Sequence, residues 1–268
     1  MSKIISIFNQ KGGVAKTTTT TNLACALGEK GKKVLLVDLD PQANSTNALG
    51  IDDESLDNSI YDLLLEYNSI QDKKKFKKER ILEFIQPTSF DVDILPSDIN
   101  LAEAEQTLSG AVSREMLLNK LLIFIKADAD YDYILIDCPP SLGLLSINAL
   151  AASDYLIIPV YPSYFSVKGI KQLLRTYYLV KDNLKPELDI MGVVITKYDQ
   201  RISKHKEIKA DLENLQIFQD KVFKNPIRTN AELEKAQDSQ KPINFFNREC
   251  NGFIDYMNLA DEVINYGR

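Results

Sequence analysis

The chain has 268 residues, of which 44% are hydrophobic, and its formal net charge is -6. This length can bury one sizeable core, so we expect a single domain over residues 1–268. The negative charge excludes a protein that binds nucleic acid through an overall positive charge, so any such contact requires a local basic patch. Cys25, Cys138 and Cys250 lack the CxxC spacing of zinc or iron–sulfur sites, and we expect Cys25 and Cys138 to be small buried side chains.

The sequence contains no pattern typical of targeting or of a membrane span. One lysine precedes the short β-like run Ile4–Phe8, which is not the arrangement of a signal peptide. No apolar stretch approaches the roughly 20 residues that a membrane span requires. We therefore expect a cytoplasmic protein without a membrane partner.

Short apolar runs alternate with longer helical patterns along the chain. Several expected strands, such as Val34–Val37 and Tyr133–Ile136, are apolar on both faces, which is typical of a parallel sheet covered by helices on each side. The pattern predicts an α/β fold of three layers, with a doubly wound, mostly parallel sheet between two layers of helices. The expected strands are residues 3–8, 33–37, 91–95, 132–136, 155–160 and 189–195. The expected helices lie near residues 17–30, 113–126, 143–152, 166–182, 203–214, 231–238 and 253–265.

The loop after the first strand has the composition of a phosphate-binding loop. Its glycines allow backbone N–H groups to turn toward an anion, and the helix that starts near Thr17 adds its positive end. Lys16 supplies a charge for the β- and γ-phosphates, and the Thr17 hydroxyl is suited to Mg²⁺. The sequence therefore predicts a site for a nucleotide with Mg²⁺. The loop residues expected to bind the nucleotide are Lys11, Gly12, Gly13, Val14, Ala15, Lys16, Thr17 and Thr18.

This loop departs from the standard pattern GxxxxGK[ST] at both glycines. Gln10 stands at the first glycine and Ala15 at the second. The loop follows instead the deviant form KGGxxKT, which has an additional lysine, Lys11, near its start. We expect a negative φ at Ala15, where a methyl group costs little.

Acidic side chains follow two of the expected strands. Strand periodicity places Asp38 and Asp40 on the same side at the end of the second strand, where ligands bind in open α/β sheets. Asp137 closes an apolar run and matches a Walker B acid. Because a carboxylate at a buried strand end is costly without a cation, Mg²⁺ is its natural partner. The expected metal-binding residues are Thr17, Asp38 and Asp137.

The sequence also contains two lysine-rich stretches. Residues 68–82 are polar, and we expect a solvated helix or loop there, with a nucleic-acid patch as the alternative. His205, the only histidine, lies in a second lysine-rich stretch that we expect to be exposed, and we assign it no catalytic role.

These motifs, in this order, resemble the ParA family of partition ATPases. The combination of KGGxxKT, DxDPQ and IDCPPSLG is highly specific. Weaker similarity continues through Gly192–Arg201 and Lys241–Ile243, so the resemblance covers nearly the whole chain. The segments that carry it are Asn9–Asn22, Val34–Ser45, Tyr131–Ala151 and Ile157–Leu174.

The resemblance implies an ATPase that binds ATP and Mg²⁺ and works as an ATP-dependent homodimer. Two nucleotides would lie between facing subunits, and Lys11 would reach the phosphates bound by the other subunit. Asp40 would position the attacking water, Thr17 would bind Mg²⁺ directly, and Asp137 would hold it through water. The catalytic residues would then be Lys11, Lys16 and Asp40.

The resemblance also implies partners. The ATP-bound dimer would bind DNA without sequence preference, which would make the protein nucleoid-associated. A ParB-like partner would stimulate hydrolysis and release the dimer, and the cycle would segregate a plasmid or a chromosome. Intrinsic turnover would therefore be slow.

The chain departs from the family in two places. The family often has a Gln and an acidic residue within the segment that reads Pro159–Phe165 here. Members carry arginines in two C-terminal segments. Arg201 matches the arginine of the first segment, whereas in the second segment Glu232 lies near the position where an arginine is expected. The candidate DNA-binding residues are Arg201, Lys204, Lys206 and Arg228, with Lys209 and Lys224 as further cations.

Several alternatives share the same core. A MinD-like membrane ATPase would end in a basic amphipathic helix, whereas residues 259–268 are acidic and short of cations. An iron–sulfur reductase would present cysteines at the dimer axis, and we expect Cys138 to be structural. A cargo-positioning ATPase and a nucleotide-switched DNA-binding regulator that hardly needs hydrolysis stay open.

Overall fold

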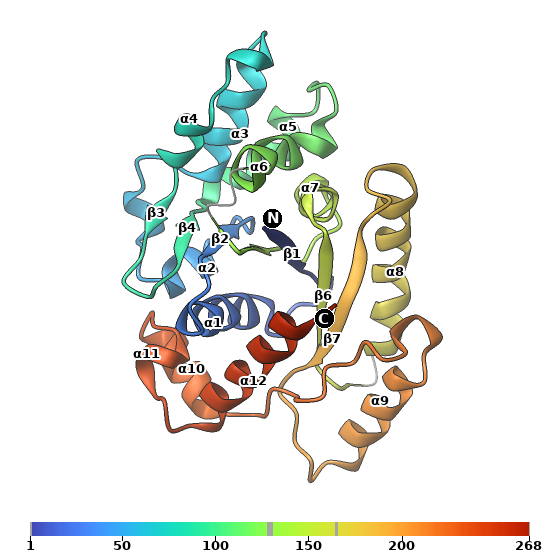
Figure 1. Cartoon of the computed structure of the whole chain (residues 1–268). Helices are drawn as coiled ribbons and strands as arrows, with labels where there is room; N and C mark the ends of the chain where they lie inside the picture. Colours follow the sequence, from blue (N-terminus) through green and yellow to red (C-terminus); the bar gives the residue numbers. More distant parts are fainter. Residues whose placement is uncertain (1, 128–130, 164–165, 268) are drawn as a thin grey trace.

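A twisted sheet forms the centre of the protein in the computed structural model, which describes residues 2–127, 131–163 and 166–267 (Figure 1). The strands are β1 (Lys3–Ile7), β2 (Val34–Asp38), β3 (Gln86–Pro87), β4 (Asp93–Leu95), β5 (Tyr133–Asp137), β6 (Tyr155–Val160) and β7 (Asp189–Ile195). They form one seven-stranded sheet in the order β3-β4-β2-β5-β1-β6-β7. Among these strands only β3 is antiparallel to its neighbour, so the sheet is mostly parallel, as the sequence predicts.

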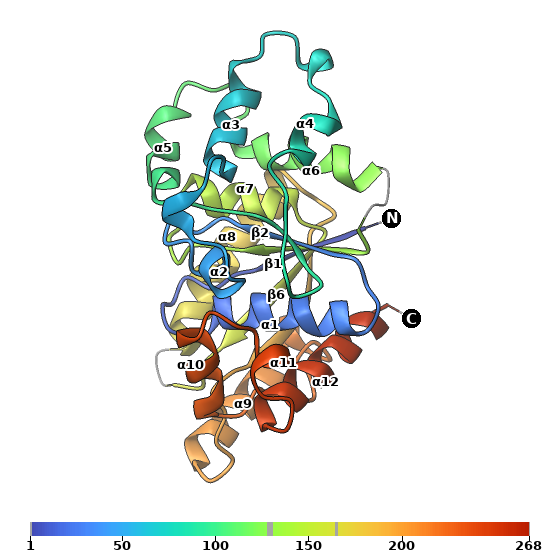
Figure 2. The same ribbon diagram turned by 90° about the vertical axis from the view of Figure 1, so that its left-hand side faces the viewer.

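Helices cover both faces of this sheet, as Figures 1 and 2 show. The longer helices are α1 (Lys16–Glu29), α3 (Ile60–Ser69), α6 (Leu117–Ala127), α7 (Leu144–Ala152), α8 (Ser166–Asn183), α9 (Ser203–Glu213), α10 (Ala231–Asp238) and α12 (Asn251–Asn265). The short helices are α2 (Asn44–Ala48), α4 (Lys78–Leu82), α5 (Ala104–Thr107) and α11 (Ile243–Phe246). The three-layer fold expected from the sequence is therefore confirmed.

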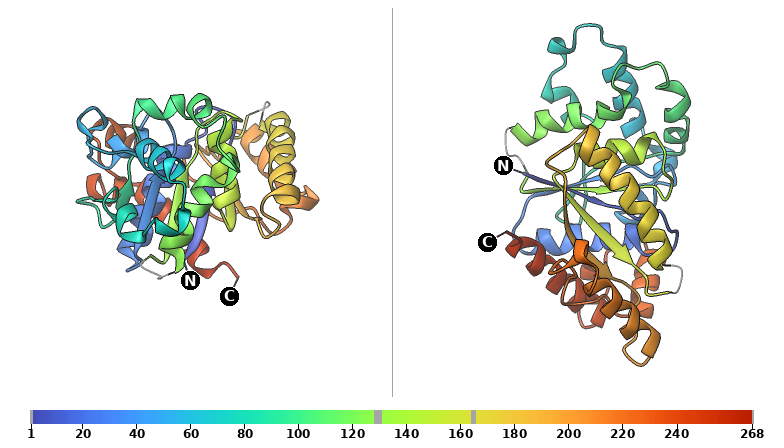
Figure 3. Two further views of the ribbon diagram at one scale, coloured as in Figure 1. Left: turned by 90° about the horizontal axis from the view of Figure 1, so that it is seen from above. Right: turned by 90° about the vertical axis from the view of Figure 1, so that its right-hand side faces the viewer.

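The period of two along each strand divides the interior into two cores. Ile4 and Leu35 pack into the core beneath α3, α6, α7 and α8, whereas Ile5 and Leu36 pack into the core beneath α1, α11 and α12. The right-hand view of Figure 3 shows α8 on one side of the sheet and α12 on the other. Strands that are apolar on both faces thus reflect burial on both faces, as expected for β2 and β5.

The sequence predictions missed β3 and the helices α2 and α3. Helix α3 nevertheless has a readable signal, because a capping box starts it: the Asp62 carboxylate accepts from the Ser59 backbone N–H at 2.9 Å. Its buried side chains then follow at helical spacing, in the order Ile60, Leu63, Leu64 and Tyr67.

That stretch, residues 68–82, folds as a short 3₁₀ turn followed by α4, in agreement with the expected solvated helix or loop. Cations of this stretch have partners within the protein. Lys73 Nζ donates to the Asn68 carbonyl at 3.0 Å, and Arg80 forms ion pairs with Glu66 and Glu83. Part of the positive charge of residues 68–82 is therefore paired within the protein.

The prediction that the lysine-rich segment around His205 is exposed is wrong at the histidine itself. The ring is 5% exposed, and its Nδ1 accepts from the Asp199 backbone N–H at 3.1 Å. It packs against the rings of Tyr161 and Tyr198, with centroids 5.8 and 6.0 Å away. The lysines around it are solvated, but the histidine is on the inward face of α9.

Cys25 and Cys138 are buried, as expected for small apolar side chains. In the part of the chain that the structure describes, none of the helices has the length and apolar character of a membrane span.

Candidate functional site

The predicted phosphate-binding loop lies between the central strand β1 and the first turn of α1. Two side chains brace it. Asn9 Nδ2 donates to the Pro159 carbonyl of β6 at 2.8 Å, while its Oδ1 accepts from the Lys11 N–H at 3.0 Å. At the other end, the Thr196 hydroxyl donates to the Val14 carbonyl at 3.0 Å. The loop is thus tied to β6 at one end and to the segment after β7 at the other.

The curvature of the loop depends on two residues with positive φ. Gly13 has a φ of 72°, and a Cβ placed on Gly12 or Gly13 would meet no atom within 4 Å, so the space above them is open. Ala15 has a φ of 64°, which corrects the expectation of a negative φ. The second glycine of the standard pattern therefore has a conformational reason here, and alanine bears a strain of about 1–2 kcal/mol in its place.

Replacing Ala15 with Gly is expected to raise the free energy of unfolding by up to about 1 kcal/mol. Relief of the left-handed strain exceeds the entropy that glycine adds to the unfolded chain, which costs about 0.4–1 kcal/mol. Chemical denaturation measures this difference, and Ala15→Val is the matched control that should destabilise, because a branched Cβ is worse at this φ. An Ala15→Gly protein that is less stable would show that Ala15 is not strained.

Lys16 begins α1 with its side chain turned into the site, where it is 8% exposed. Burial lowers the pKa of this ammonium, while the negative charges of Asp137 and Asp40 act in the opposite direction. An incompletely hydrated cation next to open space is a strong site for an anion, since phosphate oxygens replace the lost water.

Asp38 and Asp137 lie side by side at the ends of β2 and β5, where the strand register pairs them directly. Both are fully buried, and burial raises the pKa of each carboxyl. Asp137 accepts from the hydroxyls of Ser45 at 2.7 Å and Thr20 at 3.2 Å, and it also contacts the Thr17 hydroxyl.

Both oxygens of Asp38, one of the three residues predicted to bind the metal, accept hydrogen bonds from the protein. One oxygen accepts from the Thr46 N–H and hydroxyl, both at 2.8 Å, and the other accepts from the Asp40 N–H at 3.2 Å. Asp38 therefore fixes the turn that carries Asp40 and the start of α2. The residues that fit a magnesium ion are Thr17 and Asp137, because the ion would offset the cost of the buried Asp137 charge.

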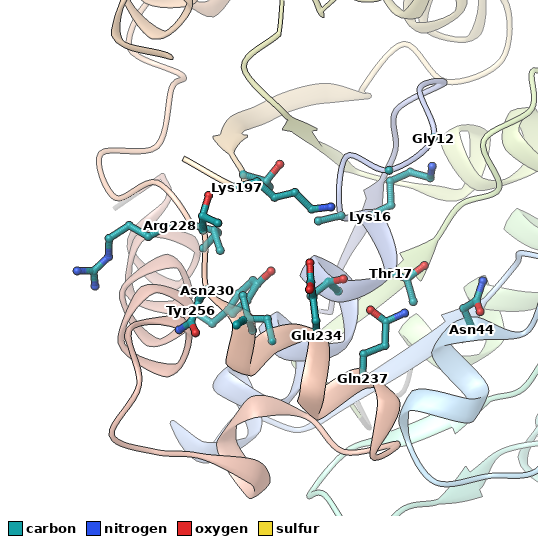
Figure 4. A pocket seen from close by; sticks show the side chains of 18 of the residues that line it. Gly12, Lys16, Thr17, Asn44, Lys197, Arg228, Asn230, Glu234, Gln237 and Tyr256 are labelled. Carbon is teal, nitrogen blue, oxygen red and sulfur yellow. The ribbon is translucent and has the colours of Figure 1, made fainter. Parts of the chain in front are cut away.

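A cavity of about 500 Å³ opens next to these groups. One wall consists of Gly12–Gly13, Ala15–Thr18 and Asp40, whose Oδ1 accepts from the Gln42 N–H at 3.0 Å. Figure 4 shows Lys16 and Thr17 on one side of the cavity, and Glu234 and Gln237 of α10 on the other. This size and mixed lining suit a nucleotide.

Sequence reasoning missed the opposite wall. Lys197 follows β7 at the same edge of the sheet, so the rule that ligands bind at the carboxyl ends of strands could have found it. The other residues come from the C-terminal third and carry no local motif. The lining residues not predicted from the sequence include Lys197, Asn230, Glu234, Gln237 and Tyr256.

Lys11 has a separate environment beside this cavity. Its Nζ donates to the Ser163 hydroxyl at 2.6 Å and lies 5.9 Å from the centre of the Tyr161 ring. Both partners belong to the loop after β6, which is one of the segments where the sequence departs from the family.

The candidate DNA-binding cations do not form one free patch. Arg201 is well exposed but pairs with Asp199 at 2.7 Å, and Lys204 pairs with Glu207 at 2.6 Å. Arg228 pairs with Asp255 of α12 at 2.6 Å, and its guanidinium points away from the cavity in Figure 4. Lys206 is exposed on α9. Glu232 is bound to Lys235 and Asn247 within the C-terminal helices.

The strand, the glycine loop with its lysine, and the acid at the neighbouring strand end define a P-loop nucleoside triphosphatase. A family model described as an AAA domain matches residues 2–190. The sporulation initiation inhibitor protein Soj of Bacillus subtilis is 41% identical over 268 residues, which is 100% of both chains. The chromosome partitioning protein ParA of Caulobacter vibrioides is 36% identical over 266 residues, which is 99% of this chain and 95% of the relative. The chain belongs to the ParA/Soj family.

A solved structure agrees with this assignment of the fold. Cobyrinic acid a,c-diamide synthase from Mycobacterium smegmatis, with a bound ATP analogue and magnesium, is 32% identical with a TM-score of 0.81. The match covers 98% of this chain and 95% of that one.

Proposed function

We propose that this chain is a partition ATPase that hydrolyses ATP with Mg²⁺ to ADP and phosphate. The observation that carries the proposal is the meeting of Lys16, Asp40 and Asp137 at one edge of the sheet, beside an open cavity. The relative from Caulobacter vibrioides, which is named as a chromosome partitioning protein, supports the biological role, and the relative with a bound ATP analogue and magnesium supports the cofactor.

In this proposal the loop residues bind and orient the phosphates. The backbone around Gly12 and Gly13 accommodates phosphate oxygens, and Lys16 places its charge between the β- and γ-phosphates. Thr17 and Asp137 would hold Mg²⁺, which neutralises charge that develops on the phosphates when it is bound. Thr18 adds a hydroxyl next to the same oxygens.

Asp40 is the residue that we assign to the attacking water. It is 7% exposed and lines the cavity, and the turn that carries it is held by Asp38. A carboxylate fixed in this way can orient a water molecule and accept its proton as the oxygen attacks the γ-phosphorus. Slow intrinsic turnover would follow if the last catalytic group, Lys11, comes from a second subunit.

The proposed cycle couples nucleotide binding to DNA. An ATP-bound homodimer binds DNA without sequence preference and is thereby located on the nucleoid, and a ParB-like protein stimulates hydrolysis and release. We assign the DNA contact to Arg201, Lys204, Lys206 and Arg228. Because three of these pair with carboxylates, the contact requires phosphates to replace them.

DNA retention tests this function. The ATP-bound protein should bind immobilised non-specific duplex, whereas the ADP-bound protein should not, and the affinity should fall about 40-fold between about 50 and 200 mM salt if three phosphates are contacted. Arg201→Glu with Lys206→Glu should reduce retention, and Lys74→Glu with Lys75→Glu is the matched charge control. No retention at low salt would contradict the DNA role, and greater loss in the control would move it to residues 68–82.

Two further measurements separate the alternatives. Flotation with anionic vesicles in ATP should leave the protein unbound, since a MinD-like protein would float. The M. smegmatis relative is named for a different activity, so turnover alone does not identify partition, and stimulation by a DNA-bound ParB-like protein is the decisive result.

A further inference from the structure

Lys11 is the one catalytic candidate that the structure does not place in the lining of the cavity. Its ammonium is held from the side by a short loop, Tyr161–Ser163, which follows β6. Strand β6 is the neighbour of β1, so this loop and the phosphate-binding loop leave the sheet next to each other. The contact therefore joins two loops whose starting points are fixed by the sheet.

Two uncharged groups contact the Lys11 ammonium. The bond to the Ser163 hydroxyl is short, at 2.6 Å, which is typical of a charge-assisted hydrogen bond. The Tyr161 ring lies within the distance at which a cation is attracted to an aromatic ring. Neither group carries a charge, so ionised phosphate oxygens bind the same ammonium more strongly.

The loop is itself well supported. The Ser163 N–H donates to the Tyr161 carbonyl at 2.8 Å, which makes a tight turn around the buried Pro162. The Tyr161 ring also packs against His205, which is buried and accepts a hydrogen bond from the Asp199 backbone N–H. This explains a buried histidine that the hydrolysis mechanism does not use.

We propose that Tyr161–Ser163 is a cradle that holds Lys11 and competes with phosphate for it. The loop regulates the proposed nucleotide site, because Lys11 must leave Ser163 before it can reach the phosphates of a second subunit. Because the cradle is uncharged, it keeps the long Lys11 side chain ordered, and releasing this side chain costs little free energy. Ser163 and Tyr161 are positioning residues that act through Lys11.

The first test needs neither nucleotide nor a dimer. An amine-reactive reagent, with labelling at each lysine quantified by mass spectrometry, should modify Lys11 about threefold to tenfold faster in Ser163→Ala than in the unaltered chain. Ser163→Thr, which keeps the hydroxyl, should restore slow labelling, and exposed Lys74 should react equally in all proteins. Equal labelling of Lys11 in Ser163→Ala and the unaltered chain would overturn the cradle.

The second test measures the competition and rests on the proposed function. Ser163→Ala should lower the ATP concentration at half-maximal dimerisation severalfold in sedimentation experiments, whereas Ser163→Glu should raise it, since a carboxylate binds the ammonium more tightly. Both effects should vanish in Lys11→Ala, which shows that the serine acts through the lysine. Ser69→Ala is the matched control, because its hydroxyl bonds the Glu66 carbonyl far from the site.

The outcomes separate the two proposals. A higher ATP requirement in Ser163→Ala would mean that Ser163 prepares Lys11 for the partner, which overturns competition. An unaltered chain that never dimerises in ATP would overturn the dimer, while the labelling result would still decide the cradle.

Discussion

Lys16→Ala should abolish useful ATP binding. We expect the dissociation constant for Mg-ATP to rise by about 100-fold, which corresponds to the loss of about 3 kcal/mol from charge-assisted contacts with the phosphates. Titration calorimetry with Mg-ATP measures this change. Because burial lowers the pKa of Lys16, its removal takes away an incompletely hydrated ammonium, so the nucleotide-free variant should unfold at nearly the unaltered temperature.

Lys30→Ala provides the matched control for this variant. Lys30 lies just beyond the other end of α1 and pairs with Asp261 at 2.7 Å, away from the cavity. Its loss should leave ATP affinity unchanged. If Lys16→Ala bound Mg-ATP as tightly as Lys30→Ala does, the phosphate-binding role of the loop would be wrong.

Asp40→Ala should separate binding from hydrolysis. We expect turnover to fall by about 10²- to 10⁴-fold, the usual contribution of a group that accepts a proton from the nucleophile. ATP affinity should stay within a few-fold of the unaltered chain, because Lys16 and the loop still hold the phosphates. Phosphate release under single-turnover conditions gives the rate, and filter binding of labelled ATP gives the affinity.

The control for Asp40 is Asp53→Ala, on the turn after α2, where the carboxylate accepts from Asn47 Nδ2 at 2.9 Å. It removes one nearby negative charge without touching the lining of the cavity. Equal turnover in the Asp40 and Asp53 variants would reject Asp40 as the residue that positions water. If Asp40→Ala lost turnover but still partitioned DNA in cells, the chain would be a nucleotide-switched regulator.

The fold was predictable from the sequence because its signals are local and repeated. The apolar runs at residues 34–37 and 133–136 are buried on both faces, which the sequence indicates without knowledge of their neighbours. The segment between β2 and β4 was not predicted well, since α4 and β3 are too short for a periodic pattern. Their position depends on contacts such as Arg80 with Glu66, which the sequence does not reveal.

The candidate site was predictable where a motif lies within one loop. The sequence located the loop at Lys11–Thr18, but it could not give the sign of φ at Ala15, which depends on how the loop closes onto α1. It also could not show which donors face Asp38 and Asp137, because those donors come from segments outside the two strands. The wall around Tyr256 depends on tertiary packing alone.

The cavity joins segments that are more than 200 residues apart, since Lys16 belongs to one wall and Tyr256 to the other. A molecule bound between them acts as a cross-link between the beginning and the end of the chain. Occupancy should therefore protect α10 and α12 from proteases, because binding raises the free energy of unfolding by RT ln(1 + [L]/Kd), where [L] is the concentration of free ligand. Digestion patterns would then report how full the site is, even for a variant that hydrolyses nothing.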